Sequence, residues 1–234
     1  MEVFNAHTED FQKGVVIPVN KPLDWTSFDV VKKIRYTLKY HRGIEKIKIG
    51  HAGTLDPKAT GLLLVCTGKA TKHISEFQDM EKTYIANIKL GATTPSFDTE
   101  TNENEQYPVD HITKSALDDV LGNFTGTINQ IPPEYSALKY KGKRAYTLAR
   151  EGKHPKLKSR EIYIENIKLT EFRKPFFSIY VTCRKGTYLR SLARDIGKEL
   201  NSGAYLVGLI RTQIGSYKLS DAYDQKIIEN ILIK

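Results

Sequence analysis

The amino-acid sequence predicts a mixed α/β fold, in a single domain built on a large sheet. Short apolar segments of strand length alternate with segments whose apolar residues recur every three or four positions, as in amphipathic helices. The chain has 234 residues, of which 40% are hydrophobic, so it is long enough to bury a sizeable core. It contains no internal repeat and no low-complexity tract. Such alternation is typical of one layered α/β domain.

The first part of the chain is expected to form three strands and two helices. Thr26 or Ser27 offers a side-chain oxygen that can cap a helix. The apolar residues of this helix share one face, at Val30, Val31, Ile34 and Leu38. A second helix is expected over Lys69–Phe77, and strands are expected over Gly14–Val19, Leu62–Thr67 and Lys82–Leu90.

The second part of the chain follows a polar loop over Ser96–Pro108. Thr113 is expected to begin a short helix that Gly122 ends, and Thr187 is expected to cap a helix that reaches Leu200. The expected strands are Phe124–Gln130, Glu161–Phe172, Phe177–Cys183 and Tyr205–Ile214, and a last helix is expected over Asp221–Ile231.

The segment from Ile131 to Arg160 differs from its surroundings. It opens with "IPPEYS", whose two prolines interrupt the strand pattern. Nine Lys or Arg residues and one Glu lie between Leu138 and Arg160, a local excess that almost equals the net charge of +9 of the whole chain. We therefore expect an inserted basic flap with little core of its own.

The distribution of charge favours a nucleic-acid partner. A second basic stretch, Lys32–Lys48, carries seven Lys or Arg residues against one Glu, whereas Ser96–Asp119 is acidic. A basic face of this kind is usually complementary to phosphate backbones. Tyr135, Tyr140 and Tyr146 lie among the cations of the flap segment. Because aromatic faces stack on unpaired bases, the pattern favours RNA loops over duplex.

Several classes of protein are disfavoured by composition. No apolar run approaches the roughly 18 residues of a membrane span, and the start, "MEVFNAHTED", lacks the order of a signal peptide. We therefore expect a cytoplasmic protein. Cys66 and Cys183 lie in apolar strand-like runs without the spacing of a zinc site or a disulfide framework. We expect buried thiols, and we expect no metal and no cofactor.

The stretch "IGHAGTLDPKATG", residues 49–61, contains a single carboxylate, Asp56. One interpretation is structural, with Asp56 as a helix cap, Pro57 at the first helical position and Gly61 at the end of a single turn. The other interpretation is chemical, and the local pattern alone does not decide between them.

Three other residues also have two interpretations. Arg190 lies in the first turn of the helix in "CRKGTYLRSLARDIG", where a cation opposes the helix dipole and favours a nearby anion. That anion could be RNA phosphate, a surface acid or Asp56. Tyr84 fits a core aromatic on an inward strand face, and His51 fits a loop histidine whose hydrogen bonds are made to the backbone.

Taken together, these motifs resemble the TruB-type tRNA pseudouridine-55 synthases, over Gly14 to Tyr217. The matching motifs are "GHAGTLDP", "KTY", "PPEYSALKYKGKRAYTLAREG", "KGTYLRSLARDIG" and "YLVGLIRTQIG", in the order of the family. The resemblance implies that Asp56 is the nucleophile, Tyr84 the active-site tyrosine and Arg190 the arginine that pairs with the nucleophile. It also implies that Tyr188 contacts the substrate and that Leu209 lines the uridine pocket.

The resemblance implies an isomerase that converts the T-loop uridine at position 55 of tRNA to pseudouridine, through a covalent aspartate adduct of a flipped-out nucleotide. It also implies a mainly antiparallel mixed sheet flanked by helices. The expected partner is the T-arm stem-loop of tRNA, with no membrane and no obligate protein partner. The resemblance and the charge pattern together predict these substrate-binding residues: His51, Tyr84, Tyr188, Leu209, Lys21, Lys139, Lys141, Lys143 and Arg144.

The expected domain organisation is an extension over residues 1–13, a catalytic domain over 14–217 with the flap at 131–160, and a helix over 218–234. No PUA domain, the small RNA-binding module of many relatives, is expected. Two positions depart from the family pattern. Asp24 in "NKPLDWTS" stands where glycine is usual, and Pro95 follows "LGATT" where aspartate is common.

Two alternative functions remain open. One is a non-catalytic RNA-binding or tRNA-folding module, in which Asp56 is only a cap. The other is a pseudouridine synthase that acts on another RNA. The sequence also leaves open whether Asp56 attacks C6 of the base or C1′ of the sugar.

Overall fold

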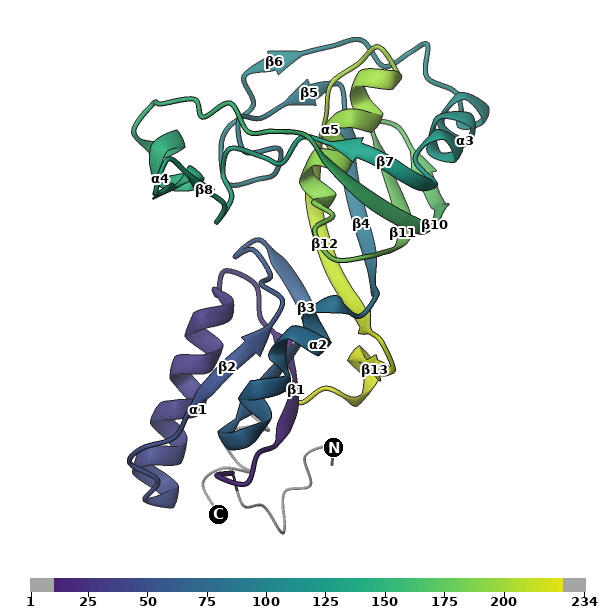
Figure 1. The fold of residues 1–234 in the computed structure, drawn as a ribbon. Coiled ribbons are helices and arrows are strands. Elements are labelled where there is room, and N and C mark those ends of the chain that lie inside the picture. Colours follow the sequence, from purple (N-terminus) through teal and green to yellow (C-terminus); the bar gives the residue numbers. More distant parts are fainter. Residues whose placement is uncertain (1–10, 225–234) are drawn as a thin grey trace. The chain divides into compact units, whose positions relative to one another are not determined.

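A computed structural model describes residues 11–224 of the chain, which separate into two compact units (Figure 1). Within the described range, unit 1 comprises residues 11–84 and 210–224, and unit 2 comprises Ile85–Leu209. The predicted catalytic domain over residues 14–217 includes parts of both units. Whether the two units act as one domain stays a prediction.

Three antiparallel strands form the centre of unit 1. β1 (Val16–Lys21) and β2 (Ile49–Ala52) each pair with β3 (Ala59–Thr67). Lys21 lies opposite Gly61 in the β1–β3 register. β3 begins three residues earlier than the predicted strand, because this pairing with β1 continues past Leu62 toward the Asp56 turn.

β3 contributes to two hydrophobic clusters, because successive side chains of a strand point to opposite faces. Leu63 packs with the apolar face of α1 (Ser27–Arg42), whereas Leu64 packs with Phe77. Phe11 is also buried in the first cluster. A residue of the expected extension over 1–13 is thus part of the core, and the first ten residues of that extension lie outside the described range.

α1 begins as the sequence predicts. Thr26 is its N-cap residue, and its hydroxyl accepts a hydrogen bond from the Asp29 amide. The Asp29 carboxylate in turn accepts one from the Thr26 amide at 2.9 Å. This reciprocal arrangement is a capping box. The predicted apolar face is buried against the strands of unit 1, and Figure 1 shows α1 alongside β2.

The remaining elements that lie wholly in unit 1 are short. The segment predicted as a helix over Lys69–Phe77 consists of a 3-10 helix and α2. Lys82, at the start of the next strand, donates hydrogen bonds to the carbonyl oxygens of Gln78 and Met80 at the end of α2. In chain order these elements are η1 (Gly68–His73), α2 (Ile74–Asp79), β13 (Tyr217–Lys218) and η2 (Leu219–Asp221).

Unit 2 is built on five neighbouring strands, in the order β12-β4-β11-β10-β7. β10 pairs antiparallel with both β11 and β7. Together with the antiparallel pairs of unit 1, this confirms the predicted mixed α/β class with a mainly antiparallel sheet. The strands are β4 (Lys82–Leu90), β7 (Gly126–Gln130), β10 (Arg160–Arg173), β11 (Phe176–Cys183) and β12 (Ala204–Ile214).

Outside the flap, unit 2 contains two helices. α3 (Lys114–Asn123) is capped by the Thr113 hydroxyl, as predicted. α5 (Leu189–Glu199) begins two residues after Thr187, whose hydroxyl donates to the Arg184 carbonyl oxygen. The predicted Thr187 cap is therefore wrong, because that hydroxyl closes the preceding turn. The polar loop predicted over residues 96–108 contains part of the small antiparallel pair β5 (Ala92–Thr93) and β6 (Glu105–Gln106).

The flap has local structure of its own. β8 (Lys139–Tyr140) pairs with β9 (Lys143–Arg144), and α4 (Ala145–Arg150) follows directly. The two-residue turn between these strands has positive φ at both Lys141 and Gly142, which matches the twist of a tight hairpin.

Part of the last predicted helix, Asp221–Ile231, lies outside the described range. Within that range, Asp221 ends η2, and the Tyr223 amide donates to the Pro18 carbonyl oxygen. Cys66 and Cys183 are buried, as predicted, and burial raises the pKa of the Cys66 thiol to about 12. Over residues 11–224, no helix has both the length and the apolar character needed to cross a membrane.

The cap of α1 gives a test of the fold. Thr26→Ala removes the hydroxyl that accepts from Asp29, and we expect it to lower the free energy of unfolding by about 1 kcal/mol. Thr26→Ser keeps a hydroxyl at the same position and should retain most of that stability. Urea unfolding of the three proteins measures the difference. Equal destabilisation by both substitutions would contradict the assignment of the cap.

Candidate functional site

Asp56 lies in a tight turn that enters β3. The Ala59 amide donates to the Asp56 carbonyl oxygen at 3.0 Å across Pro57 and Lys58, which defines a four-residue β-turn. No helix forms here, so the helix-cap interpretation of Asp56 is wrong. The reason is that Gly61 belongs to β3 and pairs with β1, which leaves no room for a helical turn.

The turn is anchored on both sides of Asp56. Leu55 is buried, and its amide donates to the Ser27 hydroxyl at 2.8 Å. On the other side, the Asp24 amide donates to the Pro57 carbonyl oxygen at 2.9 Å. The Asp56 side chain itself is half-buried. The start of α1 and the loop before it therefore fix the backbone that presents this carboxylate.

The backbone conformation at Asp24 accounts for one departure from the family pattern, in which glycine is usual at this position. Its φ is +63°, in the left-handed region that glycine adopts most easily and that Asp tolerates better than most other residues. Its carboxylate also pairs with Lys58 at 2.7 Å. The loop thus has the backbone conformation that favours glycine, although the residue is Asp.

Lys21 places a buried positive charge near Asp56. Its side chain is fully buried, and its ammonium donates to the carbonyl oxygens of Pro22 at 2.8 Å and Trp25 at 2.6 Å. Burial lowers the pKa of Lys21 to about 8, and the charge of Asp56 is the main influence that opposes this shift. At neutral pH the ammonium is therefore mostly protonated. Because Lys21 has no exposed surface, its predicted contact with substrate stays a prediction.

Arg211 holds the two ends of the Asp56 turn. Its Nε donates to the Leu62 carbonyl oxygen at 2.7 Å, and its Nη2 donates to the Gly53 carbonyl oxygen at 3.0 Å. Gly61 packs so closely that an added Cβ would lie 2.4 Å from the Arg211 carbonyl oxygen. Arg211 was not predicted as a site residue, although a lone arginine inside the apolar strand over Tyr205–Ile214 was a signal.

His51 lies on β2 and not in a loop. Burial, and secondarily the positive charge of Arg211, lowers the pKa of His51, so the ring is neutral at pH 7. Its Nδ1 is buried and has no hydrogen-bond partner among residues 11–224. The interpretation in which backbone groups satisfy His51 therefore fails at this nitrogen. Tyr84, on β4, is 8% exposed, which suits both a core residue and a pocket wall.

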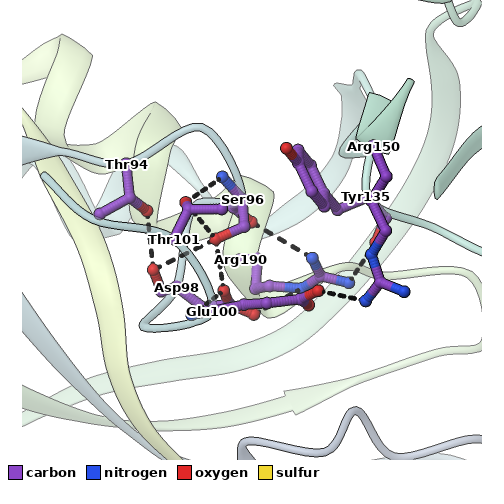
Figure 2. Close-up of polar contacts among 8 residues, drawn as sticks. All are labelled: Thr94, Ser96, Asp98, Glu100, Thr101, Tyr135, Arg150 and Arg190. Carbon is purple, nitrogen blue, oxygen red and sulfur yellow. Dashed lines mark hydrogen bonds and ion pairs between the residues drawn. The ribbon is translucent and has the colours of Figure 1, made fainter. Parts of the chain in front are cut away.

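Arg190 is buried in unit 2 and surrounded by oxygen atoms (Figure 2). Its guanidinium donates to the Ser96 carbonyl oxygen at 3.2 Å and to the Tyr135 carbonyl oxygen at 2.9 Å. Its Nε lies 3.5 Å from a carboxylate oxygen of Asp98. Asp98 is therefore an anionic partner of Arg190, and it was not among the three that the sequence suggested.

The loop around Asp98 satisfies that buried carboxylate. The Ser96 hydroxyl donates to Asp98 Oδ1 at 2.6 Å, and the Glu100 amide donates to the same oxygen at 2.9 Å. Thr94 donates to the Asp98 carbonyl oxygen at 2.7 Å. A buried charge needs such partners to offset its loss of hydration. Asp98 was not predicted as a site residue, because nothing in the local sequence distinguishes it from the exposed acids of the same segment.

The flap contacts this loop through an ion pair. Arg150, at the end of α4, donates to Glu100 at 2.5 Å, and Figure 2 shows this pair beside the Arg190 contacts. The Tyr135 carbonyl oxygen that Arg190 binds also belongs to the flap segment. The position of Arg190 therefore depends on both the 94–101 loop and the flap.

The other expected site residues also lie in unit 2. The Gln130 side chain accepts from the Tyr188 amide at 2.9 Å and donates to the Tyr188 carbonyl oxygen at 3.2 Å. Leu209 on β12 is nearly buried. Four exposed flap cations complete the set, at Lys139, Lys141, Lys143 and Arg144.

Each unit thus groups part of the predicted site. Unit 1 contains Asp56, Lys21, His51 and Tyr84, whereas unit 2 contains Arg190, Tyr188, Leu209 and the flap cations. In the described part of the chain, no group of three or more His, Cys, Asp or Glu side chains is placed to hold a metal ion.

Solved structures share this fold. One, described as a Cbf5-Nop10-Gar1 complex, matches with a TM-score of 0.71 and 28% identity, over 94% of this chain and 54% of the other. Another is an H/ACA RNP bound to a substrate RNA containing 2′-deoxyuridine, with a TM-score of 0.68 and 26% identity over 94% of this chain. This chain spans about half the length of each of these chains.

Sequence comparison identifies the class of protein. Residues 39–189 match the family model described as "TruB family pseudouridylate synthase (N terminal domain)". A protein of Parabacteroides distasonis named tRNA pseudouridine synthase B is 53% identical over 223 residues, which cover 95% of both chains. The relative of the same name from Phocaeicola vulgatus is 52% identical, over 95% of this chain and 99% of its own.

The class is therefore that of the pseudouridine synthases, which are isomerases. Within this class the chain belongs to the TruB family.

Arg211 provides a test of how the site is held. We expect Arg211→Met to lower the free energy of unfolding by about 3 kcal/mol, because two buried carbonyl oxygens lose a charged donor. Arg211→Lys should fall between Met and wild type, since one ammonium cannot reproduce the planar donor pair.

Arg35→Met is the matched control. Arg35 is exposed and donates to the Ile49 carbonyl oxygen at the long distance of 3.5 Å. Its replacement should change the stability by less than about 0.5 kcal/mol. Urea unfolding measures all four proteins, and an Arg211→Met protein as stable as the Arg35 control would show that the two hydrogen bonds do not hold the turn.

Proposed function

We propose that this protein converts the T-loop uridine at position 55 of tRNA to pseudouridine, with Asp56 as the nucleophile. The observation that carries the proposal is the Asp56 turn. A half-buried carboxylate is presented from an anchored backbone, near a buried ammonium, in a chain of the TruB family. The tRNA in the names of the two bacterial relatives supports the choice of substrate.

The reaction explains why a carboxylate serves here. The N-glycosidic bond of the uridine breaks, the uracil turns, and its C5 forms a bond to C1′ of the ribose while the proton on C5 is removed. An oxygen of Asp56 supplies an electron pair to form a temporary bond to the substrate and takes that pair back when it departs. The bond forms to C6 of the base or to C1′ of the sugar. Because no net oxidation occurs, the reaction as written needs no redox cofactor.

The other site residues have the roles that the resemblance to the TruB family implies. Arg190 orients the Asp56 carboxylate through its planar guanidinium. The contacts that Arg190 makes with the 94–101 loop and the flap fix the orientation of that guanidinium. Tyr84 packs against the uracil and assists proton removal. His51, which is half-buried on β2, helps to hold the RNA loop that the flipped nucleotide leaves. Tyr188 and Leu209 line the uridine pocket.

The target nucleotide must leave the T-loop to reach Asp56. Flipping costs a few kcal/mol, which stacking and hydrogen bonds in the pocket offset. The flap supplies binding to the T-arm. Its exposed lysines border a pocket of about 320 Å³ that Tyr140, Lys141 and Lys143 help to line. A tRNA substrate would place the enzyme in the cytoplasm.

Asp56→Asn tests the nucleophile. We expect this change to abolish pseudouridine formation while tRNA affinity stays within a few-fold of wild type, because the amide is nearly isosteric but a poor nucleophile. Asp24→Asn is the control, as it makes the same chemical change on the adjacent loop. The assay maps pseudouridine by position in unmodified tRNA. Substantial activity of the Asp56→Asn protein, or modification elsewhere than position 55, would refute the corresponding part of the proposal.

The flap lysines test how tRNA is held. Replacing Lys139, Lys141 and Lys143 together by Ala should weaken binding and reduce the log-log salt slope by roughly 0.7 to 0.9 for each phosphate that the flap no longer neutralises. Arg144 is retained, because its guanidinium donates to the Ala137 carbonyl oxygen within the flap.

The control removes the same charge elsewhere in unit 2, at the exposed residues Lys168, Arg173 and Lys198. Affinity is measured against salt concentration for wild type and both triple variants. If the flap variant and the control have the same slope, the flap lysines do not contact phosphate.

A further inference from the structure

α1 carries an exposed aromatic and basic stripe that the proposed site does not use. We define the α1 stripe as Phe28, Lys32, Tyr36, Lys39 and Tyr40. Phe28, Tyr36 and Tyr40 are 60%, 55% and 61% exposed. Residues three and four apart lie on the same side of a helix, so these side chains form one continuous surface on unit 1.

The aromatic side chains of the stripe are unusual for an ordinary solvated surface. Seven large hydrophobic side chains are exposed among residues 11–224, and three of them lie on α1. The Tyr36 and Tyr40 rings are in contact, with centroids 4.4 Å apart. The Lys39 ammonium lies 5.2 Å from the centroid of the Tyr40 ring. Clustered exposed apolar side chains of this kind usually mark a binding surface.

A pocket lies beside the stripe. It has a volume of about 510 Å³, and Trp25, Lys32 and Tyr36 help to line it. Two acids also line it, but both have partners within the chain. Asp29 accepts from Thr26, and Asp24 pairs with Lys58. The pocket therefore combines aromatic walls with lysine side chains, and both of its carboxylates already have hydrogen-bond or ion-pair partners within the chain.

The charge around the stripe indicates the partner. Within α1, five Lys or Arg residues accompany a single acid, Asp29. A purely apolar protein partner would gain nothing from these cations, whereas RNA offers both flat bases and phosphates. Aromatic side chains beside cations are the usual platform for unpaired bases.

We propose that the α1 stripe and its pocket bind unpaired bases of the substrate tRNA, outside the target nucleotide and independently of the flap. The bases stack on Tyr36 and Tyr40, and Lys32 and Lys39 contact the adjoining phosphates. The proposal rests on the proposed function for the identity of the RNA. Its chemistry, single-stranded nucleotides on an aromatic and basic platform, can be tested without catalysis.

Trp25 supplies the readout. It is the only tryptophan of the chain and lines the pocket, so its fluorescence reports occupancy. The probe is a short oligoadenylate, which contains no uridine and cannot be modified. We expect it to quench Trp25 in a saturable manner. Tyr36→Ala/Tyr40→Ala should weaken this binding roughly 5- to 150-fold for each base stack removed, whereas Tyr36→Phe/Tyr40→Phe should bind nearly as wild type does.

Two controls separate the explanations. Phe176→Ala removes a similarly exposed aromatic, 49% exposed, from β11 of unit 2 and should leave the titration unchanged. Anionic phospholipid vesicles test a membrane partner. Quenching by vesicles but not by the oligoadenylate, or equal affinity of the Ala and Phe double variants for it, would overturn the proposal.

Binding of unmodified tRNA distinguishes this proposal from the proposed function. It is measured for wild type and for both double variants, beside pseudouridine formation by wild type. If wild type forms pseudouridine but Tyr36→Ala/Tyr40→Ala binds tRNA as tightly as wild type, only the α1 proposal fails. If oligoadenylate binding depends on the tyrosines but wild type forms no pseudouridine, the proposed function fails and the RNA surface stands.

Discussion

The buried guanidinium of Arg211 is the group on which the geometry of unit 1 depends. It bonds to the backbone on either side of the Asp56 turn, at Gly53 and Leu62, while Gly61 packs against the Arg211 backbone. A buried arginine is stabilising only when its donors are satisfied. Burial of Arg211 therefore requires the turn to be formed. The hydrogen bonds that offset the lost hydration of Arg211 also position the Asp56 carboxylate.

The buried charges of unit 2 are also satisfied by polar groups of the surrounding loops. Arg190 and Asp98 share one environment, and hydroxyl, amide and carbonyl groups of the 94–101 loop and the flap supply the remaining partners. Such a network orders loops that would otherwise have little apolar surface to hold them. Lys21 in unit 1 follows the same principle with two carbonyl oxygens. Around Arg211, Arg190 and Lys21 alike, the buried charge holds the backbone of the polar loops that surround it.

The basic character of the chain is divided between two different surfaces. The flap presents lysines around a hairpin and a short helix, whereas α1 presents aromatic rings with lysines on a long helix that is packed on its other face. Both arrangements offer cations to phosphates and aromatic rings to bases, since Tyr146 of the flap is also exposed, at 39%. Net charge alone does not distinguish them, because the difference lies in the arrangement of the aromatic rings, of which three share one side of α1.

Most of the long strands and helices and the cap of α1 were predictable from the sequence alone, because periodicity and capping depend on residues a few positions apart. Thr26 with Asp29, and the apolar face of α1, are of this kind. The motifs also singled out Asp56, Tyr84 and Arg190. The tertiary structure was needed to show that Asp56 lies in a turn, that Thr187 does not cap α5, that Arg211 bonds to both sides of the Asp56 turn and that Asp98 pairs with Arg190. Arg211 bonds to backbone groups 149 and 158 positions away, and Arg190 bonds to one 94 positions away. Such partners are selected by the pairing of distant strands and the packing of loops, which local sequence pattern does not specify.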